Sequence, residues 1–155
     1  MKIYDCFMFY DEDLVIDLRL NILNEYVHKF VIVESKFTHS GKKRELLFDI
    51  NKYSKFKNKI NYIVLENEPV DLEIVHDNDT DDKKNSKYIM NALKRENFQR
   101  NGIKKGLTNA EPGDLILVSD VDEIPNLSNL DLNEINDNII LFKQNFYYYK
   151  FNLKL

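Results

Sequence analysis

The chain has 155 residues and a mass of 18.5 kDa, which is the size of a single domain. Hydrophobic residues make up 43% and aromatic residues 12%, so a core can form and wholesale disorder is excluded. The 22 basic and 26 acidic side chains leave a formal charge of −4, which argues against nucleic-acid binding over a whole basic surface. The single cysteine, Cys6, excludes an intrachain disulfide and a cysteine-based zinc site.

The first residues of the chain resemble neither a signal peptide nor a membrane-spanning segment, because Asp5 interrupts the first apolar run. We therefore expect a protein without a membrane span, located in the cytoplasm. In a reducing cytoplasm the Asn-x-Ser/Thr matches at Asn78 and Asn126 carry little weight as glycosylation sites.

Short apolar runs alternate with amphipathic and polar segments. Four of these runs predict buried strands, at residues 3–10, 30–33, 60–65 and 115–118. After the first of them, Leu14, Leu18 and Ile22 recur at i, i+4 and i+8, which predicts a helix ending near residue 26 with these side chains toward the core.

The remaining segments complete an alternating pattern. Residues 46–56 predict a short helix, and residues 85–106 predict the longest helix, with Tyr88, Ala92 and Leu93 toward the core. Residues 66–84 are acidic and predict a solvated loop. Two late apolar runs predict further strands, at residues 139–142 and 146–151, the second including the tyrosines 147–149. The alternation predicts an α/β fold with a mainly parallel sheet flanked by helices, in one domain spanning residues 1–155.

The segment after the fourth predicted strand carries the strongest functional signal. Ligands of parallel sheets bind beyond the carboxyl ends of the strands, and Asp120 and Asp122 stand at that point. Their i, i+2 spacing points both carboxylates the same way in an extended chain, which suits Mg²⁺ or Mn²⁺ holding phosphate oxygens. Glu123 is a third metal ligand, a ribose contact or a solvated residue. The alternative is that the two aspartates only begin a surface turn.

Several stretches of the chain, in order, carry a family resemblance. They are residues 4–7, 30–35, 38–42, 95–101, 113–114 and 119–125, together with the spacing of Glu12 from Arg19 and Leu20. These stretches resemble glycosyltransferase family 17, the family of the β-1,4-mannosyl-glycoprotein N-acetylglucosaminyltransferase. The resemblance covers almost the whole chain.

The resemblance implies a GT-A fold, in which a Rossmann-like domain binds a nucleotide sugar. It also implies inverting transfer of a sugar, N-acetylglucosamine in the best-known members, from a UDP-linked donor to a glycan or other hydroxyl acceptor. By position, Asp120 and Asp122 would hold Mn²⁺ or Mg²⁺ and, through it, the donor diphosphate. The predicted donor-binding residues are Glu12, Glu34, Thr38, His39, Lys42, Arg95, Gln99, Arg100, Asp120 and Glu123.

Three of the polar side chains have plain alternatives. Arg95 and Gln99 share one helical face with Arg100 close by, and a guanidinium suits a phosphate. Arg100 would otherwise be a surface residue neutralised by Glu96 at i, i+4. His39 contacts the donor or moves a proton, or is only a loop residue. His76, with Asp77 and Asp79 nearby in the sequence, forms an adventitious metal site or a solvated loop.

The sequence also departs from the family pattern. The last predicted strands correspond to the middle of the family domain, so we expect its C-terminal part to be short or missing, and no general base is nominated. This favours an alternative function, a non-catalytic nucleotide-sugar-binding module or truncated remnant without the acceptor half. Sheet edge and apolar surface left uncovered predict a homo-oligomer. A third function, phosphoryl transfer of the haloacid dehalogenase type, is disfavoured, because that type has a threonine where Ile124 stands.

Overall fold

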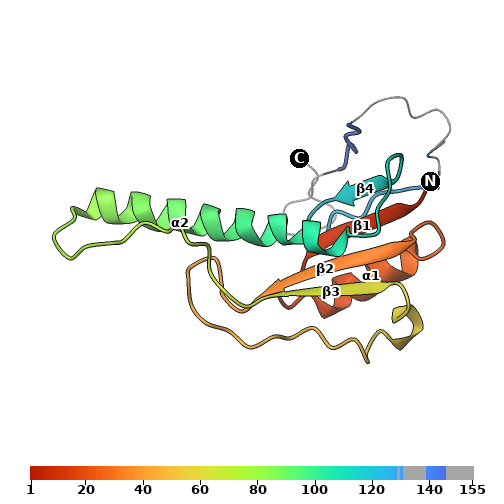
Figure 1. Cartoon of the computed structure of the whole chain (residues 1–155), viewed down its shortest axis with the longest axis horizontal. Helices are drawn as coiled ribbons and strands as arrows, with labels where there is room; N and C mark the ends of the chain where they lie inside the picture. Colours follow the sequence, from red (N-terminus) through yellow and green to blue (C-terminus); the bar gives the residue numbers. More distant parts are fainter. Residues whose placement is uncertain (129, 131–138, 146–155) are drawn as a thin grey trace. The chain divides into compact units, whose positions relative to one another are not determined.

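The computed structural model describes residues 1–128, 130 and 139–145, which belong to two units, Met1–Asp122 and Glu123–Leu155. The first unit holds the regular elements in Figure 1. They are β1 (Ile3–Met8), α1 (Asp13–Leu23), β2 (Lys29–Ser35), the 3-10 turn η1 (Ser54–Phe56), β3 (Ile60–Leu65), α2 (Asp81–Asn101), the 3-10 turn η2 (Gly102–Gly106) and β4 (Leu115–Val118).

The four strands form one parallel sheet in the order β3-β2-β1-β4. The prediction of an α/β fold is confirmed, and all four predicted strands are present. Cys6 of β1 pairs with Val31 of β2 and with Val118 of β4, so the strands end at a common edge. The chain leaves β1 toward β2 on one side and reaches β4 on the other, which creates a topological switch point at that edge.

Both faces of the sheet are covered. Tyr4, Cys6, Val31 and Val33 belong to one buried cluster, which η2 joins through Ile103. Gly106 lies so close to β2 that an added Cβ would be 2.3 Å from Val31 Cγ1. The absence of a side chain at Gly106 therefore permits the close packing of η2 on the sheet.

Helix α1 covers the opposite face, but not with the predicted side. Leu14, Leu18 and Ile22 are exposed, and Leu14 is 84% accessible. The buried side chains are Ile16, Arg19, Leu20 and Leu23. Both sets repeat at helical spacing, so apolar periodicity does not choose between them. The inward set carries Arg19, which neutralises the buried carboxylate of Asp5 on β1, and that pairing decides the rotation of the helix.

The short helix predicted over residues 46–56 is wrong, since only η1 is helical there. The backbone N–H groups of Leu47 and Phe48 donate to the Glu34 carboxylate at 2.8 and 3.1 Å. Asp49 Oδ1 then accepts from the N–H of Asn51 at 2.9 Å. Side-chain oxygens thus occupy the donors that a helix would use.

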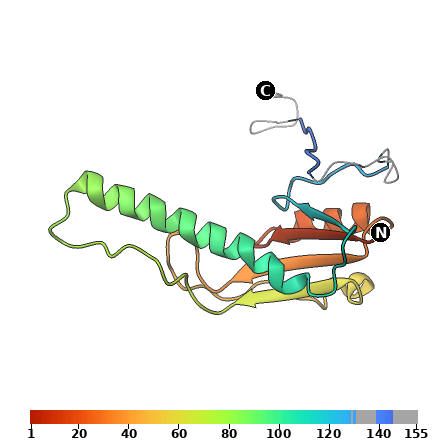
Figure 2. The same ribbon diagram turned by 45° about the horizontal axis from the view of Figure 1, so that its top comes forward.

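Helix α2 begins at Asp81, earlier than predicted, with Thr80 capping the N–H of Lys83. Of the predicted core side chains, Tyr88 and Leu93 are 59% and 46% exposed, so the prediction is wrong for these two, whereas Ala92 is half-buried. The reason is visible in Figures 1 and 2, where the N-terminal part of α2 extends past the sheet with the chain before it running alongside. We call residues 66–94 the arm.

The arm is held together by polar contacts instead of a core. The Asn91 side chain accepts from the N–H of Glu73 at 2.7 Å and donates to the Glu73 carbonyl at 2.8 Å. Lys87 and Lys94 donate to the carbonyls of Ile74 and Asp71 at 2.8 and 2.6 Å. These bonds satisfy backbone groups of the extended segment that no strand pairs with.

Two late predictions concern the second unit. Residues 139–142 do not form the predicted strand. The predicted strand at residues 146–151, including the tyrosines 147–149, lies outside the described residues. Within the described part of the chain, no helix combines the length and apolar character needed to cross a membrane.

Candidate nucleotide-sugar site

A cleft of about 800 Å³ opens at the carboxyl edge of the sheet. Five segments line it: the end of β1, the start of α1, the loop after β2, the C-terminal part of α2 and the segment after β4. The lining residues include seven that sequence analysis predicted, Glu12, Thr38, His39, Gln99, Arg100, Asp120 and Asp122. The structure therefore brings together residues that lie more than a hundred positions apart, at the switch point where parallel sheets bind ligands.

The acidic segment after β4 presents its side chains alternately. Asp120 and Asp122 are exposed and line the cleft, whereas Val121 between them is buried. Asp120 Oδ1 lies 3.3 Å from Arg100 Nη2, which also lies 3.1 Å from Glu96 Oε1. Arg100 thus forms the predicted i, i+4 pair and also lines the cleft, and its predicted role in donor binding stays a prediction.

The cleft offers only part of a ligand set for the expected metal ion. Among the described residues, no group of three or more histidine, cysteine, aspartate or glutamate side chains is arranged to hold a metal ion. Mg²⁺ in nucleotide sites, however, keeps several waters and is bound through one or two carboxylates plus substrate phosphates. Asp120 and Asp122, which line the same cleft, fit that partial ligand set, which a bound diphosphate would complete, and do not fit an all-protein cage.

Glu34, predicted to bind the donor, is fully buried and does not line the cleft. Its carboxylate accepts a hydrogen bond from Tyr62 Oη at 2.6 Å and lies 2.9 Å from Arg44 Nη1. It also accepts from the backbone N–H groups of Leu47 and Phe48, as described above. Burial and the hydrogen bond to Glu34 raise the pKa of Tyr62 above its ordinary value. Glu34 thus anchors the loop that follows β2.

Arg44 and Tyr10 are cleft residues that sequence analysis missed. The Arg44 guanidinium lies 4.3 Å from the centre of the Tyr10 ring and donates to the Ser35 carbonyl at 3.1 Å. Glu12 Oε2 accepts from the N–H of Tyr10 at 2.9 Å. Arg44 is one of several cations in a polar loop, and no spacing pattern distinguishes the one that folds back against β1.

The loop of residues 38–42 is a tight turn braced by α2. Thr38 Oγ1 accepts from the N–H of Lys42 at 3.0 Å, and Gly41 has a φ of 86°. Arg95 donates to the His39 carbonyl at 3.3 Å. Arg95 also packs against Gly41 so closely that an added Cβ there would be 2.6 Å from Arg95 Nη2. Lys42 and Arg95 therefore shape the turn that carries Thr38 and His39 into the cleft but do not line the cleft themselves.

Gln99 and Glu123 occupy different situations. Gln99 lines the cleft and is nearly buried, with its Nε2 donating to the Val33 carbonyl at 3.1 Å. Glu123 is exposed and belongs to the second unit. The donor-binding role predicted for Glu123 stays a prediction.

The comparison with known families decides what kind of protein carries this cleft. The sequence model of glycosyltransferase family 17 matches residues 1–155, the whole chain. The chain belongs to glycosyltransferase family 17. Membership indicates glycosyl transfer, with a nucleotide sugar and a glycan as the classes of partner. No curated protein and no solved structure matches the chain.

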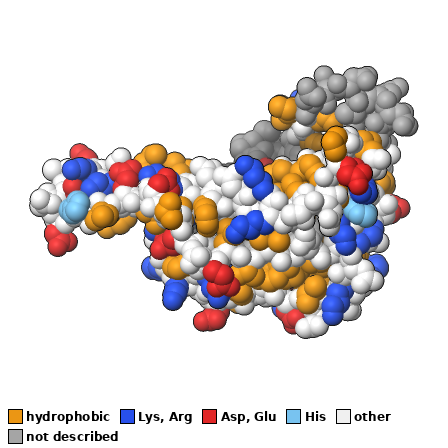
Figure 3. All heavy atoms as spheres, in the orientation of Figure 1, with side chains coloured by type: hydrophobic (Ala, Val, Ile, Leu, Met, Phe, Trp, Pro, Cys, Tyr) orange, Lys and Arg blue, Asp and Glu red, His pale blue; other side chains and the backbone are white. Residues whose placement is uncertain are grey.

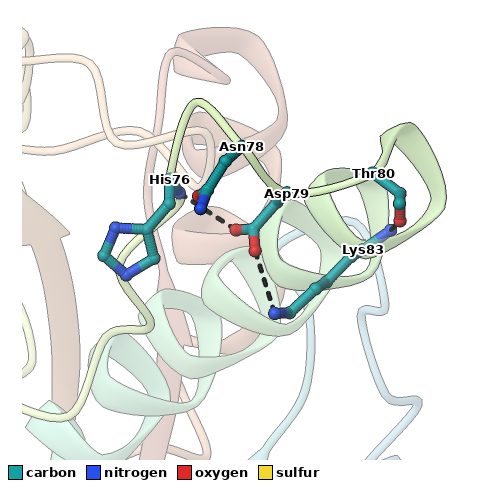
Figure 4. A pocket seen from close by; sticks show the side chains of 5 residues that line it. All are labelled: His76, Asn78, Asp79, Thr80 and Lys83. Atoms are coloured by element: carbon teal, nitrogen blue, oxygen red, sulfur yellow. Dashed lines mark hydrogen bonds and ion pairs between the residues drawn. The ribbon is translucent and has the colours of Figure 1, made fainter.

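This family 17 member has a second hollow, at the tip of the arm (Figure 4), lined by His76, Asn78, Asp79, Thr80 and Lys83. The Asp79 carboxylate accepts from the His76 N–H at 3.0 Å and pairs with Lys83 at 2.9 Å and with Lys87. These partners hold the pKa of Asp79 well below its usual range. Asp79 is thus committed to closing the turn before α2, and no three-ligand metal site exists here among the described residues.

Proposed function

We propose that this family 17 member is a metal-dependent, inverting glycosyltransferase whose cleft binds a UDP-linked sugar. The observation that supports the proposal is the lining of the cleft at the carboxyl edge of the sheet, where Asp120 lies beside Arg100 and Asp122 lines the same cleft. Carboxylates suit the metal, and a guanidinium suits the phosphates.

In this proposal each cleft residue has a defined role. Asp120 and Asp122 would hold Mn²⁺ or Mg²⁺, which supplies charge neutralisation for the leaving diphosphate. The Arg100 fork donates to donor phosphate oxygens, and the turn at Thr38 and His39 contacts the donor from the β2 side.

The acceptor side of the proposal is a hydroxyl of a glycan, and the transferred sugar is N-acetylglucosamine. Inverting transfer needs a base that removes the acceptor proton. None of the described carboxylates is assigned that role. The competing function is therefore a nucleotide-sugar-binding module that binds the donor without transferring the sugar.

Calorimetric titration tests the proposal. We expect UDP and UDP-N-acetylglucosamine, but not GDP, to bind the wild type in the presence of Mn²⁺, and Asp122→Ala to abolish this binding. Asp82→Ala, which removes an exposed carboxylate on the arm, is the matched control and should bind as the wild type does. Absence of metal-dependent uridine-nucleotide binding would overturn the proposal, and binding without sugar transfer to any glycan would favour the binding module.

We also propose that the chain forms a homo-oligomer. The arm exposes Ile89, Met90 and Leu93, and α1 exposes Leu14 and Leu18. Figure 3 shows hydrophobic side chains among charged ones along the arm. Exposed apolar side chains gathered on one surface are typical of protein interfaces.

A further inference from the structure

We infer that Arg19 is a positioning residue for the segment Ser119–Asp122, which we call the acidic loop. Arg19 holds the backbone that presents Asp120 and Asp122, without itself lining the cleft, and Asp5 fixes Arg19 in turn. The inference rests on the proposed function in one respect, namely that the acidic loop binds the metal and the donor.

The first step is the fixed geometry of the buried pair. Arg19 and Asp5 are both fully buried, on α1 and β1. Arg19 Nε donates to Asp5 Oδ2 at 2.8 Å and Nη2 donates to Oδ1 at 2.7 Å, so the pair is bidentate. The guanidinium also lies 4.7 Å from the centre of the Phe7 ring. A planar fork held on two oxygens leaves the guanidinium little freedom to rotate.

The second step is what the other N–H groups of Arg19 reach. Nη1 donates to the Asp120 carbonyl at 2.7 Å and to the Val121 carbonyl at 3.1 Å. Nη2 donates to Ser119 Oγ at 2.8 Å. One side chain therefore binds three consecutive residues of the acidic loop from beneath.

The third step is why the loop needs this support. The pairing of β4 with β1 ends at Val118, and the Ser119 N–H reaches the Cys6 carbonyl only at 3.4 Å. Beyond that point, the Arg19 bonds hold the carbonyls of Asp120 and Val121 toward the core. Val121 is buried, and the turn at Val121 and Asp122 leaves the side chains of Asp120 and Asp122 exposed where they line the cleft.

A purely structural role explains the pair less well. Apolar residues of similar volume are often as stabilising as a buried ion pair, because burying two charges costs desolvation. The pair is neutral overall, so it does not act on the carboxylates of Asp120 and Asp122 through a net charge. Its position under the acidic loop, with bonds to that loop, fits a positioning role.

Two variants test the inference. Arg19→Lys keeps the charge and loses the fork. The double variant Asp5→Leu with Arg19→Met replaces the pair by apolar side chains, which keeps the core filled if the single variant fails to fold. In each folded variant, we expect amide exchange of residues 119–122 to rise at least about tenfold and the affinity for UDP with Mn²⁺ to fall about tenfold.

Leu23→Ala is the control, because it removes a buried side chain from the same helix one turn further along, and a leucine side chain donates no hydrogen bond to the acidic loop as Arg19 does. In Leu23→Ala, amide exchange in the acidic loop and the affinity for UDP should stay at wild-type values. If Arg19 acted only by stabilising the fold, destabilising α1 through Leu23 would change the loop in the same way. Wild-type exchange in the acidic loop of either folded Arg19 variant would overturn the inference. If the wild type binds no uridine nucleotide, the proposed function fails, and the exchange rates alone still decide whether Arg19 positions the loop.

Discussion

Arg100 and Asp120 form an ion pair in the wall of the cleft, with Nη2 of the arginine 3.3 Å from Oδ1 of the aspartate. Both groups are partly exposed, so the pair is weak. A metal ion would need the same carboxylate, and a diphosphate would need the same guanidinium. The pair therefore competes with each of the two ligands that the proposed function requires.

Arg100→Gln should change the two affinities in opposite directions. Mn²⁺ alone should bind more tightly, by up to about fivefold, because an exposed ion pair contributes about 0 to 1 kcal/mol. UDP with Mn²⁺ should bind about ten- to a hundredfold more weakly, because a charge-assisted hydrogen bond contributes about 1.5–3 kcal/mol. Calorimetry of the metal alone and then of the nucleotide measures both effects.

Lys94→Gln is the matched control for Arg100→Gln, since it removes one positive charge from the same helix at the arm. Both affinities should stay at wild-type values in this variant. A change of the same sign for metal and nucleotide in Arg100→Gln would mean that Arg100 acts only through its overall charge or through folding.

Much of the site could be predicted from the sequence because its signals are local. Asp120 and Asp122 directly follow an apolar run that does form β4, and a parallel sheet brings its carboxyl ends to one edge. The turn at Thr38 and His39 follows β2 in the same way. Short-range sequence patterns are therefore enough to predict these positions, without any tertiary contact.

The parts that the sequence did not predict depend on contacts between distant residues. The rotation of α1 follows from the ion pair between Arg19 and Asp5. The helix has two apolar stripes of equal periodicity, so the sequence pattern alone does not show which of them is buried. The segment after Arg44 loses its predicted helix because Glu34 takes its N–H groups. In both cases a buried carboxylate needs hydrogen-bond donors, and meeting that need outweighs the local helical pattern.

The pairing of Asp79 predicts a pH-dependent arm. Its pKa is lowered mainly by the hydrogen bond from Lys87, then by the His76 N–H and Lys83. A carboxyl whose pKa is lower folded than unfolded stabilises the fold above its unfolded value of about 3.9, and this stabilisation is lost as the pH falls through the folded pKa. The amide shift of His76, followed by NMR, should therefore titrate with a midpoint below about pH 3.9.

Asp79→Asn is the control for this titration, because it keeps the shape of the side chain and removes its charge. The acid transition of the His76 amide should disappear in this variant, and the start of α2 should fray at neutral pH. A wild-type midpoint at or above the ordinary aspartate pKa would contradict the pairing.

The exposed side chains of the arm predict self-association. Light scattering over a concentration series should show the wild type above the monomer mass. Ile89→Glu should lower the association, because it places a charge on the exposed apolar surface. Ser86→Glu adds the same charge to an exposed polar position of α2 and should have a smaller effect. A monodisperse wild-type monomer at every concentration would rule out the homo-oligomer.

Glu34→Gln separates loop anchoring from donor binding. The variant keeps the shape of the side chain but leaves Arg44 without its buried counter-ion, so we expect a loss of about 1.5–3 kcal/mol in the free energy of unfolding. The pKa of Tyr62 should fall toward its ordinary value, because the hydrogen bond to Glu34 helps to raise it. Denaturant unfolding and an ultraviolet titration measure the two effects. Wild-type UDP affinity in the folded variant would assign Glu34 to anchoring alone, whereas weaker affinity without movement of the loop would make it a donor ligand.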